Sequence, residues 1–326
     1  MWFKTILRRR QTEDDGRKTV TRNRPSSSVY RQDSEPLFDE AFLRRMERLS
    51  LQAQRSLRGN PSSGEHLSRQ RMPTSIFSEH RPYTSGDDLR YVDWNAYARH
   101  DTVLLKLGEI EQDINVHLLI DASRSMAWGQ PAKLQSAQRL VGALGYLALA
   151  HSDRLLVAPF GSATARPFGL AQGKGQLMAL LRYIEAIQPQ PATDLANVLR
   201  THARAYPRGG ILVLCSDLLA AQGLAEGLAA LGPPRWQVLV LHTIDQRELR
   251  PELLGPLELE DSETGRRMAL TLDAETIAAY RRNFTHWQEG LAATCARSGA
   301  TYAQVISEWQ IEQKVVPYLR LRRLLT

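Results

Sequence analysis

The chain has 326 residues and a formal charge of +7, and hydrophobic residues make up 43% of it and charged residues 24%. It has two cysteines and no stretch near the roughly 18 consecutive apolar residues that span a bilayer, which argues against a disulfide scaffold, a zinc site or a transmembrane protein. Residues 1–75 hold 16 Lys/Arg and 9 Asp/Glu, whereas residues 76–326 hold 26 of each. The surplus of basic residues thus lies in residues 1–75, and we do not expect residues 76–326 to form a nucleic-acid-binding domain.

Residues 1–75 are predicted to form a basic, largely disordered arm. Residues 1–36 are poor in apolar side chains, whereas the helical apolar spacing within residues 37–58 predicts a short helix. Such an arm can touch acidic lipid or nucleic acid, although a solvated tail is the simpler interpretation. The chain begins without the apolar core of a signal peptide and its cysteines suit a reducing compartment, so we expect a cytoplasmic protein.

From about residue 110, short apolar strands alternate with amphipathic helices. The expected strands cover residues 114–120, 154–160, 211–215, 236–242 and 301–306, and the expected helices cover residues 132–151, 174–187, 194–205, 221–231 and 273–298. This alternation predicts an α/β fold with a doubly wound, mostly parallel sheet whose ligands bind beyond the carboxyl ends of the strands. The chain then divides into an N-terminal segment at 76–112, a main domain at 113–308 with a hairpin-like insertion at 256–272, and a C-terminal helix at 309–326.

Hydroxyl and carboxylate side chains occupy three of the loops at that edge of the predicted sheet. Asp121, Ser123 and Ser125 directly follow the first strand of the domain, Thr193 precedes a helix, and Asp217 follows the next apolar strand. Because these loops meet at one edge of a doubly wound sheet, we predict that the five residues form one site. Hard oxygen ligands of this kind suit Mg²⁺ or Mn²⁺. The alternative is that the serines and Asp121 only cap the helix that follows.

These five positions resemble the complete metal-ion-dependent adhesion site (MIDAS) of von Willebrand factor A-type (vWA) domains, which are doubly wound and Rossmann-like. The resemblance implies that Ser123, Ser125 and Thr193 bind the metal directly. It also implies that Asp121 and Asp217 act either directly or through water. With so few carboxylates one coordination position stays open, and an acidic side chain of a protein partner could fill it.

We therefore expect a metal-dependent protein-binding module and not an enzyme. Arg124 and Trp128, on the same loop as the serines, would line the rim of the interface. The first alternative is a metal-dependent hydrolase that uses the same site, although no histidine or free glutamate stands there as a general base. The second alternative is a nucleic-acid or membrane-surface binder that acts through the basic arm.

A second element stands just before the main domain and reads Arg81-Pro82-Tyr83-Thr84-Ser85-Gly86-Asp87-Asp88-Leu89-Arg90-Tyr91-Val92-Asp93-Trp94. It resembles the signature R-x-Y-x-x-G-D-D-x-R-x-x-D-W of the domain-of-unknown-function 58 (DUF58) family, whose bacterial members carry it before an A-type domain. The resemblance covers roughly residues 76–310. It implies a partner ATPase of the MoxR-type AAA+ group, with the pair acting in the maturation or remodelling of other proteins. Many relatives carry membrane-spanning helices at the front, where this chain carries a basic arm.

The charged and aromatic side chains of residues 81–99, which include this 81–94 element, have three interpretations. The simplest is an Arg–Asp network that locks the segment against the domain. The second is a docking surface for the partner. A catalytic acid–base pair of aspartates is the least favoured interpretation. The docking residues would be Arg81, Tyr83, Asp87, Asp88, Arg90, Asp93 and Trp94.

Overall fold

The computed structural model divides the chain into two compact units. One unit comprises Met1–Ser56 together with Asn115–Thr326, and the other comprises Leu57–Ile114. The described residues are 5–9, 37–48, 71–73, 79–85, 87–100, 102–109, 114–161, 166–192, 194–251, 254–315 and 317. Among them, no helix combines the length and the apolar character that crossing a membrane requires.

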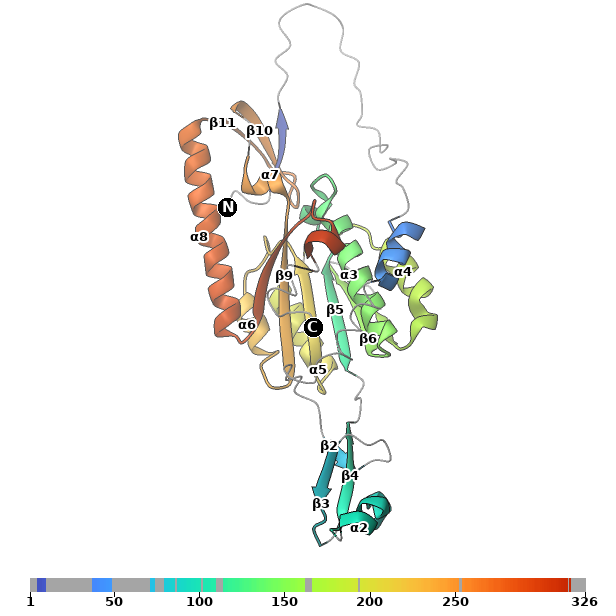
Figure 1. Ribbon diagram of the computed structural model, residues 1–326. Coiled ribbons are helices and arrows are strands. Elements are labelled where there is room, and N and C mark those ends of the chain that lie inside the picture. The colour runs from blue at the N-terminus through green and yellow to red at the C-terminus, as the bar shows by residue number, and fades with distance from the viewer. Residues whose placement is uncertain are drawn as a thin grey trace, which may run out of the picture. The chain divides into compact units, whose positions relative to one another are not determined.

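The first unit is built on a six-stranded sheet with the strand order β12-β9-β8-β5-β6-β7 (Figure 1). The strands are β5 Asn115–Asp121, β6 Arg154–Phe160, β7 Phe168–Ala171, β8 Gly210–Ser216, β9 Trp236–Ile244 and β12 Thr301–Ile306. All neighbours are parallel except the edge strand β7, which runs antiparallel to β6. This is the doubly wound, mostly parallel α/β sheet that the alternation of strands and helices predicts.

Helices cover both faces of this sheet, because alternate side chains of each strand point to opposite faces. They are α3 Lys133–Ala150, α4 Leu177–Glu185, α5 Leu195–Ala205, α6 Leu224–Ala229 and α8 Ala274–Arg297. On β5, Leu118 and Ile120 belong to one core cluster with residues of α3 and α4. Leu119 belongs to another with residues of α5, α6 and α8. A strand that is apolar on both faces thus carries one core on each side (Figure 1).

Predicted and observed bounds agree within the sheet and differ at its edges. β6 and β12 have the predicted bounds, whereas the helix predicted at 174–187 consists of the 3-10 turn η3 Lys174–Gln176 followed by α4. The sequence does not predict β7, because this short edge strand buries none of its residues and so has no apolar pattern. In the tail, Ile311–Val315 form a π-helical turn, and most of the helix predicted at 309–326 lies outside the described residues.

Residues 40–48 form a helix that packs against α3. At helical spacing, Phe42 and Met46 are buried in a small cluster with residues of α3. The predicted arm of residues 1–75 therefore contains a segment that packs on the first unit, and removing it would expose an apolar face of α3. Residues 10–36 of the arm lie outside the described residues.

A small antiparallel sheet joins the start of the chain to the insertion. β10 Gly255–Asp261 and β11 Arg267–Leu272 pair with each other, which confirms the hairpin predicted at 256–272. β1 Thr5–Arg9 pairs with β10, a strand that the polar composition of the arm does not predict. Figure 1 shows these strands and α7 Gln246–Leu249 beyond the carboxyl ends of the parallel strands. The insertion thus lies on the side of the sheet where ligands are expected.

The second unit has its own three-stranded antiparallel sheet, with the order β2-β4-β3. Its elements are β2 Arg71–Pro73, β3 Glu79–Pro82, the 3-10 turn η1 Leu89–Tyr91, α2 Trp94–His100 and β4 Leu104–Glu109. Val92 and Leu105 are buried and form a β-bridge, so the end of the turn and the central strand share a small core. The 81–94 element is thus part of a folded unit.

Two histidines face each other inside the first unit. His117 of β5 and His202 of α5 are buried, and their Nδ1 and Nε2 atoms lie 3.0 Å apart. Burial lowers the pKa of His117 to about 4. Burial, together with the charge that His117 would carry, lowers the pKa of His202 to about 3. Both side chains are therefore neutral in the folded protein at neutral pH.

Because of this buried histidine pair, we expect the folded protein to lose stability in acid. In the unfolded chain these histidines have a pKa of about 6.5, so below that pH they bind protons, whereas in the folded chain they stay neutral. The free energy of unfolding therefore falls as the pH falls. Each histidine is expected to remove about 1.4 kcal/mol per pH unit between about pH 6.5 and 4. Urea denaturation at several pH values checks this. The double variant His117→Leu/His202→Leu should show a shallower pH slope, and the exposed His286→Leu should not. Equal slopes in all three proteins would contradict the assignment.

Candidate functional site

The candidate site lies where the connections of two neighbouring strands leave toward opposite faces of the sheet. β5 lies beside β8, and the helices that follow them, α3 and α6, pack in the two different cores. In open α/β sheets such a switch point leaves a crevice beyond the carboxyl ends, in which ligands bind. Asp121 is the last residue of β5, and Asp217 directly follows β8. The topology therefore makes these two carboxylates neighbours.

Asp121 is held in place by two hydrogen bonds from the surrounding loops. Its Oδ1 accepts from the backbone N–H of Ser123 at 2.8 Å, and its Oδ2 accepts from the Ser216 hydroxyl at 2.5 Å. Only 7% of its surface is exposed. Burial, together with the charge of Asp217, raises the pKa of Asp121 to about 6. Two buried carboxylates side by side favour a cation nearby.

The two serine hydroxyls are spaced as adjacent ligands of a small cation. The Oγ atoms of Ser123 and Ser125 are hydrogen-bonded to each other at 3.0 Å, and both residues are buried. Adjacent oxygens around an octahedral ion with bonds of about 2.1 Å are separated by about 3.0 Å. Ser123 precedes the 3-10 turn η2 Arg124–Ala127, yet its hydroxyl makes no capping hydrogen bond there. The residues present thus fit a Mg²⁺-class ion, and the capping alternative does not explain the Ser123 hydroxyl.

The loop that carries the fifth predicted ligand runs beside the first loop. The backbone N–H of Gln190 donates to the carbonyl of Ala122 at 2.6 Å, and Ser123 forms a parallel bridge with Gln190. Thr193 itself lies outside the described residues. Its neighbour Asp194 caps α5 by accepting from the backbone N–H of Asn197 at 3.1 Å. The structure therefore brings four of the predicted ligands together, and metal binding by all five stays a prediction.

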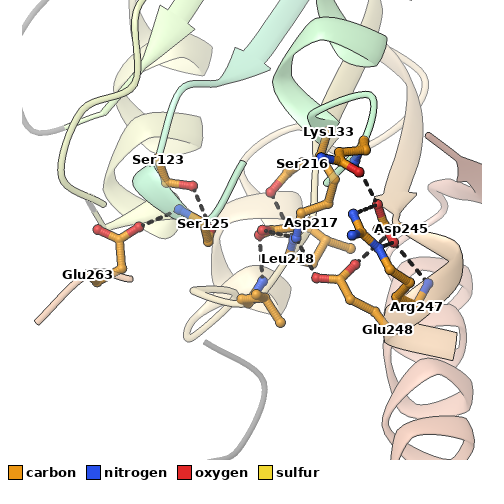
Figure 2. A network of polar contacts seen from close by, with 12 residues as sticks. Ser123, Ser125, Lys133, Ser216, Asp217, Leu218, Asp245, Arg247, Glu248 and Glu263 are labelled. Carbon is orange, nitrogen blue, oxygen red and sulfur yellow. Dashed lines mark hydrogen bonds and ion pairs between the residues drawn. The ribbon is translucent and has the colours of Figure 1, made fainter. Parts of the chain in front are cut away.

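Lys133, which the sequence analysis did not single out, places a buried ammonium in the site. It is 1% exposed, and its Nζ lies 2.8 Å from Oδ2 of Asp217 and 2.6 Å from Oε1 of Glu248 (Figure 2). Burial alone would lower the pKa of Lys133, but the two carboxylates outweigh burial and raise it. The ammonium also outweighs burial at Asp217, whose pKa is lowered. At Glu248 burial prevails, and the pKa is raised.

One signal in the sequence could have pointed to this lysine. Lys133 is the first residue of α3, where the positive end of the helix dipole disfavours a cation. A lysine there, at the start of a largely apolar helix, suggests a nearby anion. Glu248 gives a weaker signal, because it lies on the short helix α7 that follows the end of β9.

Asp245, at the end of β9, is a third carboxylate at this edge and is already paired. It is fully buried, and it accepts from the backbone N–H and the guanidinium Nε of Arg247, both at 2.9 Å. Asp245 also forms a capping box with Glu248 around α7. The Arg247 guanidinium lies 4.7 Å from the centre of the Trp128 ring. The predicted rim residue Trp128 is therefore partly covered by Arg247, whereas Arg124 is exposed.

Glu263, from the turn between β10 and β11, reaches the loops of the site. Its Oε1 accepts from the backbone N–H of Ser125 at 3.0 Å, and its Oε2 accepts from that of Ala192 at 2.9 Å. Its carbonyl accepts from Nη1 of Arg124 at 3.3 Å. In Figure 2, Glu263 approaches Ser125 from the side away from Lys133 and Glu248. The predicted hairpin therefore contributes a polar side chain to the site, and no pattern in the sequence connects Glu263 with the other site residues.

The predicted docking residues of the 81–94 element belong to the second unit. Arg81 pairs with Asp87 at 2.8 Å and Arg90 with Asp88 at 2.5 Å, and in each case the arginine lowers the pKa of the aspartate. Asp93 accepts from two backbone N–H groups at the start of α2. Tyr83 is half-buried and Trp94 is exposed. The carboxylates thus have structural partners within their own unit, which agrees with an Arg–Asp network and leaves the acid–base interpretation without support.

Asp245 and Arg247 form an ion pair at this edge, so their charges cancel. The other charged groups are four carboxylates and two cations, which leaves the candidate site negative; they belong to Asp121, Asp217, Glu248, Glu263, Lys133 and Arg124. Across the described parts of the chain, no three His, Cys, Asp or Glu side chains gather as a metal-binding cluster. The candidate centre relies on serine hydroxyls, which such a cluster does not include. What the arrangement offers chemically is a place for a hard cation next to an exposed arginine.

Comparison with known proteins gives a family for the chain. A family model described as "Protein of unknown function DUF58" matches residues 79–290. The uncharacterized proteins Rv1480 of Mycobacterium tuberculosis and Mb1516 of Mycobacterium bovis are each 26% identical over 267 residues, which cover 80% of this chain and 83% of theirs. The uncharacterized protein MAV169 of Mycobacterium avium is 25% identical over 46% of this chain and 90% of its own.

Two solved structures are similar in fold. The conserved hypothetical protein BatB from Bacteroides thetaiotaomicron has a TM-score of 0.41 and 17% identity, and the match covers 65% of this chain and 98% of that one. The vWA domain of SpRpn10 has a TM-score of 0.37 and 8% identity, over 64% of this chain and 95% of that one.

Proposed function

This chain belongs to the family described as Protein of unknown function DUF58, and from that premise we propose that it is a protein–protein interaction module and not an enzyme. The binding surface is the edge of the sheet beyond β5 and β8. In such sheets this edge is where ligands bind. The loops at this edge carry Asp121, Ser123, Ser125 and Asp217, and the exposed Arg124 stands among them.

The same edge is proposed to hold a Mg²⁺ or Mn²⁺ ion. Ser123, Ser125 and Thr193 would bind it through their hydroxyls, and Asp121 would bind it directly or through water. Asp217 would act through water, because its Oδ2 already contacts the Lys133 ammonium and its Oδ1 accepts from the backbone N–H of Leu219. A bound ion supplies a point of positive charge to which a carboxylate can bind.

One observation carries this proposal, namely the pairing of two close serine hydroxyls with two buried carboxylates at the switch point. The Ser123 and Ser125 oxygens are 3.0 Å apart, and the carboxylate of Asp121 is buried beside that of Asp217. The single ammonium of Lys133 contacts Asp217 and Glu248, and the charge of Asp121 remains. A divalent cation would offset that remaining charge.

The partner is proposed to contribute an acidic side chain. The resemblance of the 81–94 element to its family implies an ATPase of the MoxR-type AAA+ group, with a role in the maturation or remodelling of other proteins. The exposed Arg124, beside the serines, would attract the same acidic surface. A rival docking surface is favoured by exposed apolar side chains in the second unit, where Leu89 is 56%, Trp94 59% and Tyr97 39% exposed.

Co-purification with a candidate ATPase tests both proposals. We expect Ser125→Ala and EDTA each to abolish co-purification, because both disturb the ion. Trp128→Ala should weaken co-purification without removing a metal ligand, because the substitution removes the aromatic ring that Arg247 contacts at the rim of the site. Trp94→Ala should leave it unchanged. Binding that survives Ser125→Ala, Trp128→Ala and EDTA but is lost in Trp94→Ala would show that the partner docks on the second unit.

A further inference from the structure

The turn that carries Glu263 is organised to present this side chain. Oδ1 of Asp261 accepts from the backbone N–H groups of Glu263 and Thr264, both at 2.9 Å. The backbone of Asp261 also bonds across the turn, to Gly265 and Arg266 at 2.8 Å each. Gly265 has a φ of 69°, a left-handed conformation that glycine adopts without strain. A turn with this many internal hydrogen bonds fixes the direction of the glutamate.

The Glu263 carboxylate bridges the two loops that carry the hydroxyl ligands. Each of its oxygens accepts one backbone N–H, from Ser125 on the loop after β5 and from Ala192 on the loop before α5. Ser125 is itself a proposed ligand, and Ala192 directly precedes the proposed ligand Thr193. A carboxylate oxygen that accepts one hydrogen bond keeps a lone pair for another partner. The carboxylate therefore lies against both loops that carry the proposed hydroxyl ligands, and it has lone pairs left to bind an ion.

We propose that Glu263 is an internal ligand of the divalent-cation site. It occupies the coordination position that a partner's acidic side chain would otherwise take. The inference rests on the proposed function, because it needs the ion. It assigns a role to the β10–β11 insertion: the hairpin closes the site within the chain, and an acidic partner has to displace Glu263 to reach the ion. Partner binding then includes the movement of the β10–β11 turn.

The test uses Mn²⁺ alone with the full-length protein. Calorimetric titration gives the affinity, and water proton relaxation of the bound ion reports how many water molecules it carries. In Glu263→Gln we expect the Mn²⁺ affinity to fall by roughly tenfold, the scale of losing one supporting carboxylate. The relaxation per bound ion should rise, because water takes the position that the carboxylate leaves. Glu258→Gln removes the same charge from strand β10 of this hairpin and should change neither quantity.

Each outcome decides the inference. Lower affinity with higher relaxation supports it. Lower affinity with unchanged relaxation would mean that Glu263 only fixes the loops, and unchanged affinity would mean that it does not act on the ion; either result overturns the inference and leaves the proposed metal site standing. Failure of the unaltered protein to bind Mn²⁺ overturns both, so the titration of that protein tells the two failures apart.

Discussion

In Lys133→Met, the free energy of unfolding is expected to fall by about 3–5 kcal/mol at neutral pH in EDTA. Methionine fills a similar volume, but it leaves the carboxylates of Asp217 and Glu248 buried without the ammonium that now lies 2.8 Å and 2.6 Å from them. Uncompensated buried charge costs far more than the lost pair contributes. Urea denaturation measures the loss.

Two further measurements sharpen this prediction. Adding a large excess of Mg²⁺ should restore part of the stability, because an ion that binds only the folded state stabilises it by mass action. Lowering the pH should also reduce the deficit, since a protonated carboxyl needs no counter-ion. Lys174→Met, at an exposed position, is the matched control and should change stability little. A loss below about 1 kcal/mol in Lys133→Met would contradict the assigned ion pairs.

Asp121→Asn is expected to weaken Mg²⁺ binding by more than about 100-fold, the upper end of what the loss of a supporting group alone costs. Asparagine keeps an oxygen that can accept from the N–H of Ser123 or the hydroxyl of Ser216, so the loops keep most of their hydrogen bonds. It also removes one of two adjacent buried charges, whose repulsion contributes to the raised pKa of Asp121. The metal-free variant should therefore be at least as stable as the unaltered protein.

The opposite signs of these two effects make the measurement decisive. Calorimetric titration with Mg²⁺ gives the affinity, and thermal unfolding in EDTA gives the stability. Glu289→Gln, on the exposed face of α8, removes the same charge far from the proposed ligands in sequence and should alter neither. Undiminished Mg²⁺ binding by Asp121→Asn would exclude Asp121 from the site.

The sheet, and the meeting of Asp121, Ser123, Ser125 and Asp217 at one edge of it, could be predicted because their signals are local. The strand that ends at Asp121 is apolar from Val116 to Ile120 except for His117, and β8 before Asp217 is a continuous apolar run from Ile211 to Cys215. The rule that ligands lie beyond the carboxyl ends of parallel strands then places both carboxylates at one edge without knowledge of side-chain contacts. Asp245 could have been found by the same rule, because it directly follows β9.

The remaining site residues depend on contacts between distant parts of the chain. Lys133 and Glu248 are 115 residues apart in sequence, and Ser125 and Glu263 are 138 apart. No periodicity links such positions, since their meeting depends on how α7 and the β10–β11 hairpin fold back over the sheet. β1 shows the same limit, because a strand in a polar arm is stabilised by its pairing with β10 and not by its own composition.

If the proposed role of Glu263 holds, the insertion controls access to the site, while the rest of the domain holds the fold. β10 and β11 leave and rejoin the domain between α7 and α8, and their register pairs Gly255 with Leu272 at the base. The turn between Asp261 and Arg267 can therefore change in length or sequence without shifting a strand of the main sheet. Relatives with the same sheet but different turns would admit different partners, and a designer could exchange this one hairpin to alter selectivity while leaving both cores untouched.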